Sequence, residues 1–231
     1  MPQPVRRPTA LSRVDRSCIA VIGDIVRSKR IQGAGRDRLQ QQLKRTLDQL
    51  NKRHHAAILS RFIVTAGDEF QGLLCTGAPI PDIVWATDGR RWGIEIRFGI
   101  GCGRLDTKIE PYAIGMDGPV WHRAREAVRL ARAKAWLGGV FRGFGDPEET
   151  ILNGLARLLH HTRRGLTERQ FAIFEALRLT PHQTTVAQTL GITRQAISKQ
   201  TRSTGWEAYR EGETAWRLAL QQFDYCRSWQ K

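Results

Sequence analysis

The sequence predicts an α+β fold, in which an antiparallel sheet covered by helices is followed by a small all-α helix-turn-helix domain. Three observations lead to this prediction. Up to about residue 140 the hydrophobic pattern gives the order strand, helix, strand, strand, helix, strand, helix, which suits an antiparallel sandwich rather than a doubly wound sheet. Glycine and proline then crowd into residues 138–147, as is typical of a boundary. Beyond it, residues 184–199 carry the spacing of a helix-turn-helix motif.

The domain organisation that follows has four parts. We expect a disordered basic lead-in at 1–17, a sheet domain at 18–140, a linker at 141–147 and a helical domain at 148–231. The lead-in has arginines but no apolar core after them, so it is not expected to be a secretory signal.

Charge indicates the class of partner. The 231 residues carry a formal net charge of +15, which favours phosphate-bearing partners such as nucleic acid or nucleotides. No apolar run approaches the ~18 residues of a spanning helix, so we expect no membrane contact. The dispersed Cys18, Cys75, Cys102 and Cys226 predict reduced core thiols in the cytoplasm, not disulfides or a metal knuckle.

The first predicted elements are a buried strand at 18–22 and an amphipathic helix at 35–54. The helix repeats leucine at three-and-four spacing with polar residues between, as expected when one face packs on a sheet. A strand at 57–64 follows, and it forms a hairpin with residues 70–74.

Three further elements complete the predicted sheet domain. Prolines begin a short helix at 79–86. Residues 92–101 alternate and then become glycine-rich, which predicts a strand with another backbone close to it. The helix at 118–137 has small apolar side chains on one side and basic ones around the rest, so it is expected to pack on the sheet.

Two acidic turns fall where predicted strands end. Asp24 follows the first strand, and Asp68 and Glu69 lie in the hairpin turn. If the strands are neighbours, Asp24 and Asp68 meet at one rim, where two carboxylates repel each other unless a cation such as Mg²⁺ or Mn²⁺ lies between them. We therefore predict Asp24 and Asp68 as metal ligands. The alternative is that both are ordinary turn residues, since Gly-Asp is common turn chemistry.

The residues after the first turn are candidates for holding phosphate. The turn exposes successive backbone N–H groups beside Ser28, Lys29 and Arg30, an arrangement that suits the polyphosphate of a nucleoside triphosphate.

Four segments carry a resemblance to known families. Residues 24–26 resemble the first metal-binding strand of class III nucleotide cyclases, and residues 66–70 differ from the GGDEF motif of diguanylate cyclases only at Ala66. Residues 97–103 resemble the cyclase RIGIHTG strand, and residues 120–125 resemble the cyclase VNLAAR helix, with Arg125 at its arginine. More closely, this arrangement followed by a helix-turn-helix resembles the SatD family of bacterial proteins.

The cyclase resemblance implies a ferredoxin-type palm domain and a set of site residues. Asp24 and Asp68 would hold the metal, Glu69 would be a further catalytic candidate, and Arg125 would bind the phosphates and stabilise charge developing on them. Trp121 stands where cyclases have the asparagine that orients the ribose, which argues against cyclisation.

The helical domain has its own apolar stripes. A helix at 148–161 is followed by one that Thr167 caps with Gln170, and aromatic residues mark a final helix from 206 to 225. Those rings are expected to pack in the core or in a homodimer, with base stacking as the alternative.

The helix-turn-helix motif is the candidate DNA reader. Ala187 allows close helix crossing, Gly191 supplies the turn and Ile197 fills the core, whereas Gln200 stands where an apolar residue is usual. The alternative is a helical hairpin for protein contacts. The polar side chains that the second helix would present to DNA are Thr193, Arg194, Gln195, Ser198, Lys199 and Arg202.

Three functions follow from these features. The first is a DNA-binding transcription regulator whose palm domain binds a nucleotide through a divalent metal. The second is a Mg-dependent nucleotidyl cyclase or nucleotidyltransferase with a DNA-binding module attached. In the third, the palm domain is structural and only dimerises the reader. We favour binding over turnover, because no complete set of residues for reading a nucleotide is visible.

Overall fold

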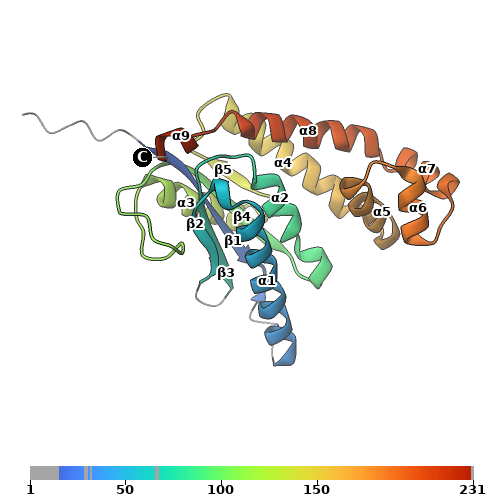
Figure 1. Ribbon diagram of the computed structural model, residues 1–231, viewed down its shortest axis with the longest axis horizontal. Coiled ribbons are helices and arrows are strands. Elements are labelled where there is room, and N and C mark those ends of the chain that lie inside the picture. Colours follow the sequence, from blue (N-terminus) through green and yellow to red (C-terminus); the bar gives the residue numbers. More distant parts are fainter. Residues whose placement is uncertain (1–15, 29–30, 32, 66–67, 230–231) are drawn as a thin grey trace, which may run out of the picture.

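The structure is a computed structural model, and it describes residues 16–28, 31, 33–65 and 68–229 (Figure 1). The predicted lead-in lies almost wholly outside these residues. The fold is α+β, as predicted, with a five-stranded sheet in the order β2-β3-β1-β4-β5. The strands are β1 (Ser17–Ile25), β2 (Ile58–Val64), β3 (Glu69–Leu74), β4 (Ile96–Arg104) and β5 (Val140–Arg142).

The element order predicted up to residue 140 is confirmed. The helices between the strands are α1 (Ala34–Arg53), η2 (His55–Ala57), α2 (Ile80–Ala86), η3 (Gly89–Trp92) and α3 (Pro119–Ala133), where η marks a 3₁₀ helix. The strand predicted at 92–101 is wrong at its start, because η3 ends at Gly93 with φ 67° and β4 begins only at Ile96. Strand β5 was not predicted, and it adds to β4 in parallel.

The central strand β1 is buried on both faces and so divides the core in two. It pairs antiparallel with β3 on one side and β4 on the other. Ile19 and Val21 pack in the cluster that includes α1 and α2, whereas Ala20 and Ile22 pack against α3. Because side chains alternate along a strand, Asp24 continues the series that faces α3.

Helix α3 lies directly on the backbone of β4 and is the close backbone neighbour that the glycine-rich pattern predicted without identifying it. A Cβ at Gly99 would come within 2.3 Å of the carbonyl oxygen of Ala124, and one at Gly101 equally close to that of Val120. This contact fixes the position of α3 over the sheet, and with it the position of the arginines that α3 carries.

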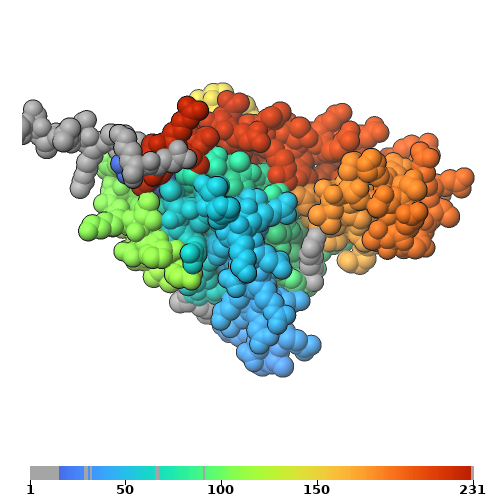
Figure 2. Space-filling model, in the orientation of Figure 1, coloured from blue at the N-terminus to red at the C-terminus, as the bar shows by residue number. Residues whose placement is uncertain are grey.

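The C-terminal half begins with a helix that lies along the sheet domain and ends with one that returns to it. The helices are α4 (Glu148–Arg164), α5 (Glu168–Leu179), α6 (Gln183–Leu190), α7 (Arg194–Ser203), α8 (Trp206–Gln221) and α9 (Cys226–Trp229). Trp216 of α8 packs on Trp85 of α2 at 5.6 Å between ring centroids. The aromatic rings of α8 thus belong to the core. Helices α5, α6 and α7 form the end of the molecule drawn in orange (Figures 1 and 2).

The boundary predicted at 141–147 stays a prediction. Strand β5 lies partly within that range, and Leu152 of α4 belongs to the same hydrophobic cluster as Phe141 of β5. The chain end also returns to the sheet domain, where the indole nitrogen of Trp229 donates to the carbonyl of Ser17 at 2.9 Å.

The prediction for the cysteines is wrong for one pair. Cys18 and Cys102 are free and buried, as expected, but Cys75 and Cys226 form a disulfide. They are 151 residues apart in sequence and meet because Tyr225 donates its N–H to the carbonyl of Cys75 at 2.8 Å. The cysteine pattern therefore does not support the cytoplasmic assignment. Separately, none of the described helices is long and apolar enough to cross a membrane.

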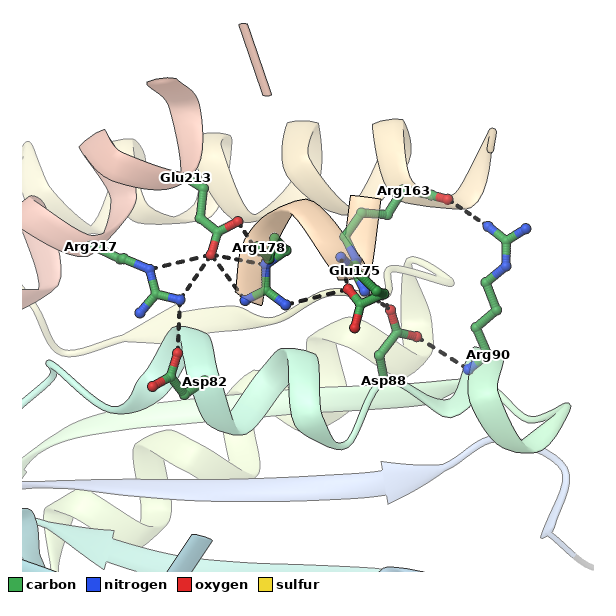
Figure 3. Close-up of polar contacts among 8 residues, drawn as sticks. All are labelled: Asp82, Asp88, Arg90, Arg163, Glu175, Arg178, Glu213 and Arg217. Atoms are coloured by element: carbon green, nitrogen blue, oxygen red, sulfur yellow. Dashed lines mark hydrogen bonds and ion pairs between the residues drawn. The ribbon is translucent and has the colours of Figure 1, made fainter. Parts of the chain in front are cut away.

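A chain of ion pairs joins the sheet domain to the helical half (Figure 3). At one end Arg217 of α8 bonds Asp82 of α2 at 2.8 Å, and at the other Arg163 of α4 bonds Asp88 at 2.9 Å. Between them Glu213, Arg178 and Glu175 continue the series without a break. We call these seven residues the ion ladder. Charged groups hidden from water need such partners, so the ladder holds α4, α5 and α8 in register with α2.

Candidate functional site

The predicted acidic residues lie together where β1 and β3 end. Asp24 and Glu69 face each other as partners across β1 and β3. The N–H of Ile25 donates to the carbonyl of Asp68 at 2.9 Å, which brings the second acidic turn beside the first. We call Asp24, Asp68 and Glu69 the acidic rim.

Arginines from two elements bind the acidic rim. Arg132 of α3 contacts both oxygens of Asp24, with Nη2 2.6 Å from Oδ1 and Nε 3.1 Å from Oδ2, and reaches Glu69 at 3.2 Å. Arg97, the partner of Asp24 across β1 and β4, lies 3.3 Å from Oδ2. Arg125 contacts Glu69 at 3.5 Å. The bidentate contact of Arg132 with Asp24 is the strong form of a charge-assisted hydrogen bond.

Burial makes these contacts necessary for Asp24. Its side chain is only 4% exposed, whereas that of Arg132 is half exposed. The hydrogen bond to Asp24 raises the pKa of Arg132 above its ordinary value, and the charges of Glu69 and Asp68 add to this effect. Arg132 is therefore a permanent cation at the rim. With Arg97 and Arg125 it places three positive charges at the rim, where they contact Asp24 and Glu69.

A divalent cation does not fit the rim as these side chains lie. Both oxygens of Asp24 are already bonded to guanidinium groups, and Oδ2 of Asp68 accepts a hydrogen bond from the Ser28 hydroxyl. Over the described part of the chain, no three His, Cys, Asp or Glu residues are grouped so that they could hold a metal ion. That Asp24 and Asp68 bind a metal ion stays a prediction.

The other predicted site residues have different outcomes. Ser28 lies at the rim, but Lys29 and Arg30 fall outside the described residues. The prediction did not include Arg97 and Arg132. Arg132 follows Arg125 by two helical turns, so both lie on one face of α3, but only the packing of α3 on β1 shows that this face meets Asp24.

Helices α6 and α7 lie where the helix-turn-helix motif was predicted. Gly191 ends α6 with φ 64°, the left-handed conformation that glycine adopts without strain. The hydroxyl of Thr193 then accepts the N–H of Ala196 at 3.1 Å and so caps α7. Of the six residues predicted to face DNA, five are exposed and Ser198 is half-buried.

The opposite side of α7 packs inward. Ile197 and Thr201 are buried. Gln200 lies beside α5, where its side-chain oxygen accepts a hydrogen bond from the amide of Gln170 at 3.1 Å. An amide pair thus takes the place of the apolar contact that is usual at this position, and the helix continues without interruption to Ser203.

Comparison with known proteins gave one family and a group of distant structures. The model of the SatD family matches residues 18–218. The catalytic core of a rhodopsin-guanylyl cyclase with converted specificity, in complex with ATPalphaS, is 18% identical, with a TM-score of 0.34 over 48% of this chain and 71% of that chain. A non-canonical dimeric guanylyl cyclase domain of the RhoGC fusion protein from the aquatic fungus Blastocladiella emersonii is 19% identical, with a TM-score of 0.31 over 48% and 72%. No curated protein matches the chain.

Proposed function

The chain belongs to the SatD family, and from that premise we propose that it is a DNA-binding regulatory protein whose sheet domain binds the phosphates of a nucleotide at the acidic rim. The observation that carries the DNA-binding part is the division of α7 into two faces. Ile197 and Thr201 are buried, while Arg194, Gln195 and Lys199 are exposed.

The exposed residues of α7 have the chemistry that duplex DNA requires. Arg194 and Gln195 begin the helix, which is the end that enters the major groove in this motif. Arginine and glutamine pair bidentately with guanine and adenine edges, respectively. Lys199 lies further along and suits a phosphate contact. A homodimer would present two copies of α7 to successive half-sites of an operator.

The arginines support the nucleotide-binding part. Arg97, Arg125 and Arg132 are planar donors whose geometry matches phosphate as well as carboxylate, so they can exchange one partner for the other. Ser28 adds a hydroxyl beside them. The Mg²⁺ or Mn²⁺ that the sequence predicts has no role in this proposal, because Arg132 already bonds both oxygens of Asp24.

A purely structural rim is the second candidate, and one observation favours it. The acidic rim is balanced by arginines without any ligand, as a group of ion pairs that only holds α3 to the sheet would be. Titration of the full chain with ATP and GTP distinguishes the two. A structural rim predicts that Arg125→Gln leaves any binding unchanged, whereas a nucleotide site at the rim predicts binding that Arg125→Gln weakens.

The DNA-binding proposal is tested by titrating a labelled random-sequence duplex with the full chain at several salt concentrations. Each phosphate contact contributes about −0.9 to the slope of log K against log salt. We expect Lys199→Ala to flatten that slope by about one such contact, and Arg129→Gln, an exposed change on α3, to leave it unchanged. Wild-type protein that binds no duplex even at low salt would contradict the proposal.

A further inference from the structure

A cavity of about 740 Å³ lies between the sheet domain and the junction of α4 and α5. Its walls come from the segment after β1, the end of α2 with η3, the start of β4, and α4 with the first residue of α5. None of the acidic rim residues lines it. Pockets for small organic ligands typically measure about 300–1,000 Å³, so this one has the volume of a ligand site.

One wall of the cavity is apolar. Val26, Ile31 and Ile94 line it with half-buried side chains that a ligand can touch, whereas Trp85, Ile96 and Phe98 are at most 4% exposed and offer little surface. Such a wall favours a flat apolar ring, which gains from leaving water.

Four of the described arginines line the cavity, and three of them are paired with carboxylates that also line it. Arg163 is paired with Asp88 at 2.9 Å, Arg164 with Glu95 at 2.9 Å and Arg90 with Glu168 at 3.2 Å. The fourth lining arginine is Arg27, which makes no ion pair with any residue that the structure describes. It is exposed, directly after β1, and its φ of 56° is rare for a residue with a side chain. The lining thus offers an uncompensated positive charge beside an apolar wall.

His160 of α4 adds a neutral polar group. Burial lowers the pKa of His160 below its ordinary value of 6.5, so the imidazole is uncharged at neutral pH. Its Nε2 has no hydrogen-bond partner among the described residues. Buried polar atoms are usually paired, so an unpaired ring nitrogen in a cavity wall indicates a group that a ligand can satisfy.

We propose that this cavity binds a small organic anion that carries a flat ring, with the ring on the apolar wall, the anionic group near Arg27 and a polar ring substituent near His160. This site goes beyond the nucleotide phosphates assigned to the acidic rim. A nucleoside monophosphate and an aromatic carboxylate share the required chemistry, and the test separates them.

The test is calorimetric titration of the full chain with AMP, GMP and CMP, with indole-3-carboxylate, and with inorganic phosphate as the anion without a ring. We expect at least one ring-bearing anion to bind with a single saturable site, and inorganic phosphate to bind about tenfold more weakly or not at all. No binding by any ring-bearing anion, or equal binding by inorganic phosphate, would overturn the proposal.

Two variants assign the binding to the cavity, and two others serve as controls. Leu137→Trp fills the cavity from its lining loop, and Arg27→Asn removes the charge with a residue that tolerates a positive φ. Each should weaken binding by about tenfold or more, and Arg129→Gln should not. An unchanged circular dichroism spectrum shows that a variant is folded. If Leu137→Trp does not fold, Arg27→Asn alone decides the outcome. Binding that survives both changes but is lost in Arg132→Gln belongs to the acidic rim and refutes the cavity site.

Discussion

Replacing Arg132 by glutamine tests how the acidic rim is balanced. The change removes two hydrogen bonds to Asp24, at 2.6 and 3.1 Å, and one to Glu69 at 3.2 Å. Breaking a fully buried ion pair costs about 3–5 kcal/mol, because the remaining charge is left without compensation. Arg132 is half exposed and Arg97 stays 3.3 Å from Asp24, so we expect a smaller loss of about 1–3 kcal/mol.

The assay is thermal unfolding with and without Mg²⁺. For a chain of this size the melting temperature should fall by about 2–4 °C for each kcal/mol lost. In Arg132→Gln the freed carboxylates become available to a cation, and a ligand that binds only the folded state stabilises it by about 2.7 kcal/mol at a hundred times its dissociation constant. Mg²⁺ should therefore stabilise the variant more than it stabilises wild type.

Two control variants accompany Arg132→Gln. Lys44→Gln removes an exposed charge from α1, which packs on the other face of the sheet, and should behave as wild type. Adding Asp24→Asn to Arg132→Gln should abolish the extra effect of Mg²⁺. A wild-type gain from Mg²⁺ as large as that of Arg132→Gln would refute the view that Arg132 occupies the place of a cation.

Three further outcomes test the rest of the structure. Arg163→Met should lower the free energy of unfolding in urea by about 3–5 kcal/mol, because Arg163 is 1% exposed and its loss takes the ion-pair partner from Asp88 and one of two arginines from Glu175; a loss below about 1 kcal/mol would contradict its role in the ion ladder. Burial alone would raise the pKa of Glu213, but hydrogen bonding from Arg178 helps to lower the pKa below 4.5. The ionised Glu213 therefore stabilises the fold above pH 4.5, and this stabilisation is lost as the pH falls through the folded-state pKa. Glu213→Gln should accordingly show a smaller loss of stability on acidification, and equal losses would count against the pairing. Alkylation of the denatured, unreduced protein should label two of its four cysteines and spare Cys75 and Cys226, whereas four labelled thiols would rule out the disulfide.

Features that depend on nearby residues were predictable from the sequence. Thr167 and Gln170 form the expected capping box at the start of α5, because both partners lie within one turn of helix. A close backbone neighbour of β4 was predicted from its glycine-rich pattern, since strand glycines make room for another backbone, and the structure shows that this neighbour is α3.

Features that depend on distant residues were not predictable. Strand β5 has only three residues in a glycine-rich stretch, so no alternation marks it. Asp24 meets Arg97 only through the register of β1 with β4, and it meets Arg132 only through the face of the sheet that α3 covers. The packing of α3 and the register of β4 thus bring arginines to Asp24, for which the sequence predicts only a metal ligand or a turn residue.

The measurement that tests the central claim most directly is selection of duplexes from a random pool by the full chain at moderate salt. We expect wild type to enrich one sequence, and Arg194→Ala with Gln195→Ala to lose preference at the base positions that those side chains contact, at a cost of roughly 1–3 kcal/mol for each good bidentate contact. Wild type that enriches no sequence, or a double variant that enriches the same sequence equally well, would show that α7 does not read DNA.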